Sequence, residues 1–337
     1  MSDLTAESEP SHEIPIEPSE LFAVEGLGTV GVRVVRELVS SRPSIGVEII
    51  GSTTERFEAV SSALGPAVRR GSNVSGVSLA ILSGASGDHA AAATRWLERG
   101  VDVISMSDDL DDVTALLALD ARARELDRCL LVGSAASPGL TCLLTRHAAA
   151  ALDQVNEIHV ASFGAGGAAC LRQRQRQLLD RAREWRDGEW VDHAGGSGKE
   201  LCWFPDPVGA KDCARGALAD PLLLTRAFPQ VRRVTSRTAV AASDRVLGFL
   251  PQRNKTVEGD PGAVRVEVRG VVGIEPTTLV YAVHDRLGAA AAALTGVVAS
   301  TWSEHRRPGA YGVAELIEPL PVLRELARRG VKAATYS

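Results

Sequence analysis

Leu21-Phe-Ala-Val-Glu-Gly-Leu-Gly-Thr-Val-Gly-Val-Arg-Val-Val-Arg-Glu-Leu38 is the stretch that decides the fold of this chain. Its first four residues form an apolar run typical of a buried strand. Three glycines follow at the spacing G-x-G-x-x-G, and the apolar residues after them recur at helical spacing. A strand that passes through such a turn into a helix indicates a dinucleotide-binding unit at the start of the fold.

Each glycine of this turn has its own physical task. Gly26 allows the tight turn, Gly28 lets backbone amides approach a pyrophosphate, and Gly31 lets the helix pack closely on the strand. The amides at the helix start, where Thr29 and Val30 lie, then face the anion. The alternative is a turn of the same shape that binds no nucleotide.

The second expected strand, residues 47–51, leads to the place where the adenosine ribose would lie. An Asp or Glu there would bind the ribose 2′-hydroxyl of NAD, whereas hydroxyls and a cation suit the 2′-phosphate of NADP. This chain has hydroxyls and a cation at that place: Ser52, Thr53, Thr54 and Arg56. We therefore favour NADP over NAD, although Glu55 or Glu48 could turn toward the ribose. The alternative for the three hydroxyl residues is a helix N-cap.

Strand and helix patterns continue to alternate, which is typical of a doubly wound parallel sheet. Strands are expected at 77–82, 101–106 and 129–132, and helices at 86–99 and 109–126. Ligands bind at the carboxyl ends of such strands. This rule places four further residues around the nicotinamide: Ser83, Gly84, Met106 and Ser107.

Two polar residues of this half do not fit the pattern of a ligand site. Glu25 puts a carboxylate before the glycine turn, where an apolar residue is more usual, and it faces either the solvent edge or the substrate. His89 is expected on the surface of its helix.

Composition limits the class of protein. The 337 residues carry a formal net charge of -5, which argues against a general nucleic-acid binder and favours a small-molecule substrate. The five cysteines form no C-x-x-C pair, so we expect reduced thiols in a cytoplasmic protein. No apolar run reaches the length of a membrane span, and the N-terminus lacks the order of a signal peptide. Residues 1–19 are acidic, rich in proline and expected to be a disordered tail.

The middle of the chain predicts a second domain. A strand at 156–163, a glycine turn at 164–167 and an amphipathic helix at 170–185 come first. Alternating segments at 264–270 and 279–283 indicate antiparallel strands whose sheet packs on helices or on a second subunit, and we expect a homodimer. The predicted fold is α/β, with a Rossmann doubly wound sheet at 20–152, a smaller α+β substrate domain at 153–286, and a C-terminal segment at 287–337 that returns to the first domain.

Several segments together resemble the saccharopine dehydrogenase (reductase) family. The resemblance is carried by residues 97–109, by residues 133–141 with the turn Pro138-Gly139-Leu140, and by residues 307–316 and 321–331. It implies NADP-linked oxidation of an amine, or reduction of the matching imine, with Ser137, Pro138 and Gly139 beside the substrate. Ser137 stands where close members of the family commonly have Asp.

A substrate carboxylate has one candidate site. The turn at 164–167 leads into a helix, so free amides converge near Gly166 and Gly167. Arg172 would bind the carboxylate through paired hydrogen bonds, and Cys170 would have a depressed thiol pKa. The alternative is that the glycines serve packing alone and that Arg172 lies in solvent.

The acid or base of the reaction is not fixed by any motif. Four residues are candidates: Asp108, Lys199, Lys211 and Asp212. Residues 195–199 imitate a phosphate loop but lack its first glycine and its hydroxyl residue, and the histidines form no zinc pattern, so no metal is expected. The rival function from another class is a non-catalytic NADP(H)-binding sensor or scaffold.

Overall fold

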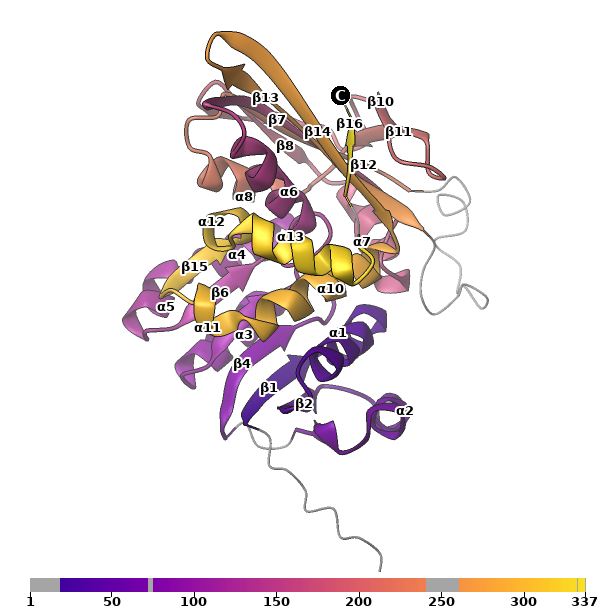
Figure 1. Ribbon diagram of the computed structural model, residues 1–337, viewed down its shortest axis with the longest axis vertical. Coiled ribbons are helices and arrows are strands. Elements are labelled where there is room, and N and C mark those ends of the chain that lie inside the picture. The colour runs from indigo at the N-terminus through magenta and orange to yellow at the C-terminus, as the bar shows by residue number, and fades with distance from the viewer. Residues whose placement is uncertain (1–18, 72–74, 241–260, 332, 337) are drawn as a thin grey trace, which may run out of the picture.

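The computed structural model describes residues 19–71, 75–240, 261–331 and 333–336 (Figure 1). Apart from Ser19, the expected N-terminal tail lies outside the described residues. The described chain forms two sheets, one at each end of the molecule, with helices between and around them (Figure 1). No helix in this part of the chain is long and apolar enough to cross a membrane.

The first sheet has seven strands in the order β15-β6-β5-β4-β1-β2-β3, and every neighbouring pair is parallel. Its strands are β1 (Glu20–Glu25), β2 (Ile45–Ile50), β3 (Val68–Arg70), β4 (Val77–Leu82), β5 (Asp102–Ser105), β6 (Cys129–Val132) and β15 (Gly309–Gly312). The helices between them are α1 (Thr29–Ser41), α2 (Thr54–Leu64), α3 (His89–Glu98), α4 (Leu110–Leu117), α5 (Asp120–Glu125) and α6 (Leu140–Ala149). This is the doubly wound arrangement that the alternating pattern predicts.

The second sheet has nine strands and is mixed. Strand β7 (Gln154–Phe163) lies at its centre, parallel to β12 (Arg233–Ala239) and antiparallel to β13 (Gly262–Val272), which pairs with β14 (Glu275–Asp285) in a long hairpin. The other strands are β8 (Ala182–Arg186), β9 (Glu189–His193), β10 (Glu200–Trp203), β11 (Ala210–Arg215) and β16 (Ala333–Tyr336). The predicted fold class, a Rossmann sheet with a second mixed domain, is confirmed.

Two of the expected helices are wrong in length. The helix expected at 109–126 is two helices, since α4 ends at Leu117 and α5 begins at Asp120. The carboxylate of Asp120 accepts a hydrogen bond from the amide of Ala310 in β15. The helix expected at 170–185 is α7 (Ala168–Gln177), followed by strand β8. Trp185 pairs with Val234 of β12 and donates to the carbonyl of Val231, so pairing in the sheet overrides the helical spacing.

The C-terminal segment contributes to both sheets. Its first helix, α10 (Leu287–Ser300), is buried on nearly all sides and packs on α1. Three short helices follow: α11 (Trp302–His305), α12 (Val313–Leu316) and α13 (Pro319–Arg328). Helix α8 (Asp220–Ala227) precedes this segment, between β11 and β12. Strand β15 then joins the first sheet, whereas β16 pairs with β14 of the second sheet. The expectation that this segment returns to the first domain therefore does not describe its last strand.

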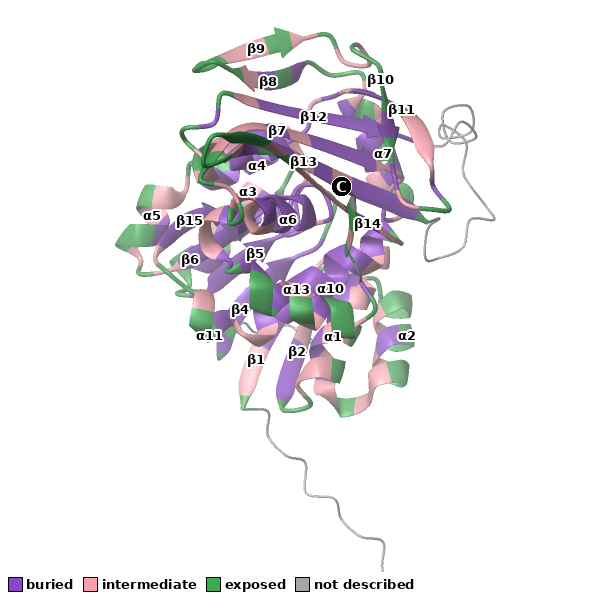
Figure 2. Cartoon of the chain, turned by 45° about the horizontal axis from the view of Figure 1, so that its top comes forward, coloured by how far each residue is buried: buried purple, intermediate pink, exposed green. Residues whose placement is uncertain are grey.

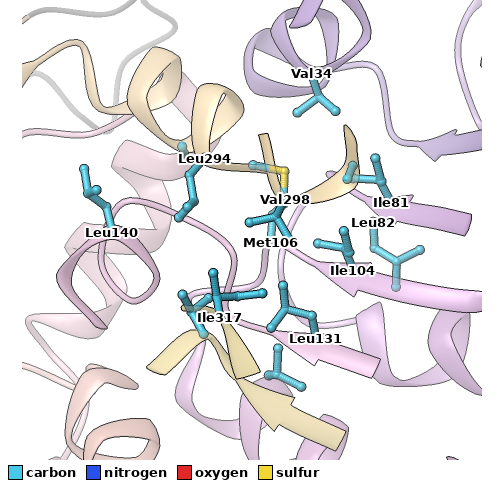
Figure 3. Packing of buried hydrophobic residues seen from close by; sticks show 14 of the residues in the cluster. Val34, Ile81, Leu82, Ile104, Met106, Leu131, Leu140, Leu294, Val298 and Ile317 are labelled. Atoms are coloured by element: carbon cyan, nitrogen blue, oxygen red, sulfur yellow. The ribbon is translucent and has the colours of Figure 1, made fainter. Parts of the chain in front are cut away.

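The core joins the first sheet to these helices. Figure 3 shows buried side chains of α1, α6 and α10 together with those of β4, β5 and β6. Gly296 of α10 allows close contact with α1, because a Cβ there would lie 2.7 Å from the Cβ of Glu37. Burial is greatest along the central strands of both sheets and least on the outer helices and hairpins (Figure 2). The rigid core thus fixes the carboxyl ends of the parallel strands, where the site lies.

Candidate functional site

A cavity of about 410 Å³ lies between the two sheets, and we call it the cleft. Its wall is built from the turn between β1 and α1, the carboxyl ends of β4, β5 and β6, the turn and helix after β7, and the start of α10. Eight of the residues predicted to bind a cofactor lie in this wall: Gly26, Gly28, Thr29, Val30, Arg56, Ser83, Gly84 and Met106. The topological switch between β1 and β4 therefore opens directly into the cleft.

The glycine turn fits a bound pyrophosphate. Gly26 has φ of 99°, and a Cβ there would lie 2.4 Å from the amide nitrogen of Gly84. A Cβ on Gly31 would lie 2.1 Å from the carbonyl oxygen of Gly26, so that glycine serves packing. A Cβ on Gly28 would meet no atom within 4 Å, and no side chain caps the start of α1. Open space and free amides at one point are what an anionic group needs.

Two arginines lie near the end of β2, where the sequence predicts the adenosine ribose. Arg56 is in the wall, and its Nη1 donates to the carbonyl of Leu27 at 3.4 Å. Arg70, at the end of β3, donates through Nη1 to the hydroxyl of Thr54 at 3.2 Å and through Nη2 to the carbonyl of Ser52 at 3.3 Å. The sequence did not point to Arg70, because it lies 16 residues after Thr54 and meets it through the pairing of β2 with β3.

The remaining predicted cofactor residues lie outside the wall of the cleft. Ser52 and Thr54 lie beside Arg70, and Thr53 caps α2 by accepting from the amide of Arg56 at 3.4 Å. Ser107 is fully buried behind the wall. Thr53 therefore serves as a helix N-cap, as the alternative for these residues proposed. The hydroxyl of Thr54 lies next to the guanidinium of Arg70.

Glu25 and His89 stabilise the strand ends below the cleft. Glu25 accepts from the indole of Trp96 at 2.8 Å and from Arg95 at 3.1 Å, so it points neither to the substrate nor to open solvent. The expectation of a surface His89 is wrong, since the ring is buried with Nδ1 2.9 Å from the Ser105 hydroxyl and Nε2 3.3 Å from the Gly84 carbonyl. Burial lowers the pKa of His89, which favours the neutral ring.

Asp108 is the one candidate acid or base that lies in the wall of the cleft. Its side chain is 17% exposed, Ser86 donates to its Oδ1 at 3.2 Å, and Nη2 of Arg174 lies 3.5 Å from its Oδ2. Burial raises the pKa of Asp108, and the nearby charge of Arg174 opposes that rise. A carboxyl with a raised pKa beside a cavity is suited to proton transfer.

The structure does not bring the other three candidates to the cleft. Lys199, Lys211 and Asp212 lie on or next to the hairpin of β10 and β11, at the edge of the second sheet. The ammonium of Lys211 lies 5.1 Å from the centre of the Phe163 ring, and Asp212 is exposed. Only Asp108 therefore remains next to the expected nicotinamide position.

Helix α7 presents a polar face to the cleft. Gly166, Gly167, Cys170, Gln173, Arg174 and Arg176 lie in the wall, whereas Arg172 does not and is exposed. Arg174 is only 5% exposed, and its Nε and Nη1 have no hydrogen-bond partner among the described residues. One feature of the sequence could have identified Arg174. Cys170, Gln173, Arg174 and Gln177 follow the spacing i, i+3, i+4, i+7, so they share one face of the helix, and this face is polar although it is largely buried.

The thiol of Cys170 does not behave as expected. Burial raises its pKa to about 11, and the charge of Asp108 adds to the rise. The expected depression is wrong, because desolvation of a thiolate outweighs the nearby helix amides.

Ser137 lies in the wall of the cleft and donates a hydrogen bond to Asp220, a buried carboxylate that the sequence alone does not point to. Asp220 is fully buried and accepts from Ser137 at 2.8 Å and from Thr141 at 2.6 Å. Burial raises the pKa of Asp220, and these hydrogen bonds oppose the rise. Pro138 and Gly139 shape the turn behind Ser137, since a Cβ on Gly139 would lie 2.2 Å from the Ala135 carbonyl oxygen. Within the described ranges no cluster of His, Cys, Asp and Glu could hold a metal ion.

Comparison with solved structures identifies the fold. The chain superimposes on the apo saccharopine dehydrogenase (L-Glu forming) of Saccharomyces cerevisiae with a TM-score of 0.68 at 14% identity, over 95% of this chain and 100% of that one. It matches the DAP dehydrogenase of C. glutamicum in complex with DAP with a TM-score of 0.50 at 18% identity, over 93% and 99% of the two chains. An engineered D-amino acid dehydrogenase bound to NADP+ gives a TM-score of 0.50 at 16% identity, over 92% and 99%.

No protein-family model and no curated protein sequence matches the chain. The likeness is therefore one of fold, and at that level the resemblance to saccharopine dehydrogenase is confirmed. The chain shares the fold of the matched dehydrogenases, a Rossmann sheet with a second mixed domain.

Proposed function

We propose that this chain is an NADP-dependent oxidoreductase that acts on the C–N bond of a small substrate carrying a carboxylate. One observation carries the proposal: the glycine turn that fits a pyrophosphate lines the same cleft as Asp108 and the buried Arg174 beside it. A nucleotide site alone would leave the function open. A buried guanidinium with unused donors beside a carboxyl adds the two groups that a zwitterionic substrate requires.

The cofactor assignment rests on the residues of the first sheet. The turn at Gly26, Gly28 and the start of α1 would hold the pyrophosphate, and Arg56 and Arg70 would face the 2′-phosphate. When bound, the nicotinamide ring supplies or accepts the hydride. Of the matched dehydrogenase structures, one contains DAP and another contains NADP+, which supports this assignment of the cleft.

The substrate assignment rests on α7. Arg174, whose Nε and Nη1 have no hydrogen-bond partner among the described residues, would bind a substrate carboxylate through its guanidinium, in place of the role expected for Arg172. The matched structures include dehydrogenases named for saccharopine, DAP and D-amino acids, so an amino acid or an opine-like secondary amine is the substrate class that fits. Removing such a buried donor pair from water is costly unless a ligand satisfies it.

Asp108 is the group that moves the proton. Oxidation of an amine to an imine removes a hydride from carbon and a proton from nitrogen, and Asp108 takes that proton when it is ionised. In the reverse direction its protonated form returns the proton. Ser86 and Arg174 hold the carboxylate in place through contacts at 3.2 Å and 3.5 Å. We propose that the two sheets form the nucleotide and substrate domains, and the homodimer and cytoplasmic location stay predictions.

We expect the protein to bind NADPH at least tenfold more tightly than NADH, which corresponds to about 1.4 kcal/mol. The physical reason is that Arg56 and Arg70 would both meet the 2′-phosphate. Arg70→Glu and Arg56→Glu should each remove most of the preference by weakening NADPH alone. Fluorescence titration of reduced cofactor measures both affinities.

The matched control is Arg36→Glu, which makes the same charge change at an exposed position of α1. Equal affinities of the unaltered protein for NADPH and NADH would contradict the NADP assignment. Failure to bind either nucleotide would contradict the oxidoreductase proposal as a whole.

A further inference from the structure

A second cavity, of about 430 Å³, lies at the end of the second sheet that is remote from the cleft. Its wall comes from residues where β7 and β12 begin, where β8 ends, and where the hairpin of β13 and β14 turns back. Figure 2 shows the ribbons of these strands. Four arginines are part of its wall: Arg186, Arg232, Arg233 and Arg269. We call this cavity the arginine pocket.

The strand registers place the charges of the arginine pocket in one row across the sheet. Arg186 of β8 stands directly opposite Arg233 of β12, which stands opposite Glu157 of β7. Glu157 in turn stands opposite Arg269 of β13, and Arg269 opposite Thr278 of β14. Positions paired in this way point to the same face of a sheet. Five neighbouring side chains therefore converge, and three of them are cationic.

The acids in the wall are too few to neutralise these cations. Asp187 pairs with Arg232 at 3.2 Å, and Glu157 lies 3.5 Å from Arg269. Glu189 stands opposite Arg186 in the hairpin of β8 and β9, but no ion pair forms between them within 4 Å. Among the described residues, neither Arg186 nor Arg233 has an ion-pair partner. The wall carries four arginines and two carboxylates, a surplus of two positive charges. Glu267, from outside the wall, accepts from Nε of Arg269 at 2.7 Å, so Arg186 and Arg233 are the arginines of the wall that have no ion pair with a described residue.

Two unpaired arginines opposite each other are unfavourable in a bare sheet. Like charges in a directly paired cross-strand position repel each other. The Nε of Arg233 is also buried without a hydrogen-bond partner, which adds the cost of an unsatisfied donor. An oxyanion between the two guanidinium groups would remove both penalties, because each group donates two parallel hydrogen bonds to such a ligand.

We propose that the arginine pocket binds a small oxyanion with at least two negative charges, either a phosphoryl compound or a polycarboxylate. The hydroxyl of Thr278 and the amide of Asn156 provide further hydrogen bonds from the same wall. The site is separate from the cleft. Glu157 lies in the wall of the arginine pocket, and β7 runs on to Phe163, two residues before Ala165 in the wall of the cleft; at about 3.3 Å per residue the stretch from Glu157 to Phe163 alone spans roughly 20 Å. A ligand of the arginine pocket is thus distinct from substrate and cofactor.

The test is calorimetric titration of the full-length protein, saturated with NADPH, with inorganic pyrophosphate and separately with citrate. Titration at 0.15 M salt, an ionic strength of about the physiological value, screens nonspecific attraction. We expect saturable binding of at least one probe, with one site per chain. Because Arg186 is exposed, Arg186→Ala preserves the fold and should weaken binding at least tenfold. The double variant with Arg233→Ala should abolish it.

Two controls separate this site from others. Arg181→Ala makes the same charge change nearby, at a side chain that is 81% exposed and paired with Asp192, and should leave binding unchanged. Arg174→Ala in the cleft should also leave it unchanged, so a result here does not depend on the proposed enzyme activity.

Three outcomes would overturn the proposal. The first is that neither probe binds with saturation. The second is that Arg174→Ala, and not Arg186→Ala, removes the binding, because the anion would then occupy the cleft. The third is that Arg186→Ala changes the oligomeric state in sedimentation while no anion binds, because the surface would then be an interface between two copies of the chain.

Discussion

Asp108→Asn is expected to lower the turnover number by two to four powers of ten while NADPH binding stays within about twofold of the unaltered protein. The amide has nearly the shape of the carboxyl, so it keeps the contact with Ser86 but cannot take a proton. Asp108 lies in the wall of the cleft, so the change acts where the substrate nitrogen would lie. Steady-state kinetics with the substrate identified below measure the effect.

The matched control is Asp212→Asn, since both residues were candidates and Asp212 lies on β11, outside the wall of the cleft. It should retain full turnover. Full activity of Asp108→Asn together with an inactive Asp212→Asn would reverse the assignment.

The pH profile gives Asp108 a second signature. Burial raises its pKa, so the ionised form that accepts a proton appears at higher pH than for an ordinary carboxyl. For amine oxidation, kcat should therefore fall as the pH is lowered through this raised pKa. Asp108→Asn should lose that acidic limb.

Arg174→Ala is expected to raise KM for a carboxylate substrate by one to two powers of ten, or about 1.5–3 kcal/mol, with no change in NADPH affinity. Arg174 lies in the wall of the cleft, and its nearly fully buried guanidinium has two donors without a partner among the described residues. Arg172→Ala is the matched control two residues earlier on the same helix, where the side chain is exposed, and should leave the kinetics unaltered.

Arg174→Lys separates charge from geometry. It keeps a cation beside Asp108 and so limits the cost of an unpaired buried carboxylate, but it cannot donate two parallel bonds. We expect KM to lie between those of the unaltered protein and Arg174→Ala. If Arg172→Ala raised KM more than Arg174→Ala did, Arg172 would be the residue that binds the carboxylate. That result would contradict the assignment of this role to Arg174.

The nucleotide half of the fold could be predicted because its signals are local. The strand, the three glycines and the helix of residues 21–38 are continuous in sequence, and short apolar runs mark the strands at 21–24, 79–82 and 129–132. The space around Gly28 is open, as the approach of a pyrophosphate requires, and the space around Gly31 is filled, as close packing of the helix on the strand requires. Both agree with the roles expected from the G-x-G-x-x-G spacing.

The substrate half depends on contacts between distant segments. Trp185 lies in a strand because β12 is there to pair with it, and Asp220 meets Ser137 across 83 residues. Arg172 and Arg174 cannot be distinguished by residue type, and only the packing of α7 shows which one is buried. The burial of His89 does not follow from its helix alone, because its partners are Ser105 at the end of β5 and Gly84 in the connection before α3.

The most direct test of the central claim, that the cleft transfers a hydride to and from a C–N bond, is the absorbance of reduced nicotinamide. The protein is mixed with NADP and a panel of amino acids, diamines and opine-like secondary amines, and in the reverse direction with NADPH and the matching pairs of amine and oxo acid. We expect at least one pair to change the absorbance, and its substrate to carry a carboxylate. Tight NADPH binding without turnover by any member of the panel would contradict the account and favour a nucleotide-binding sensor or scaffold.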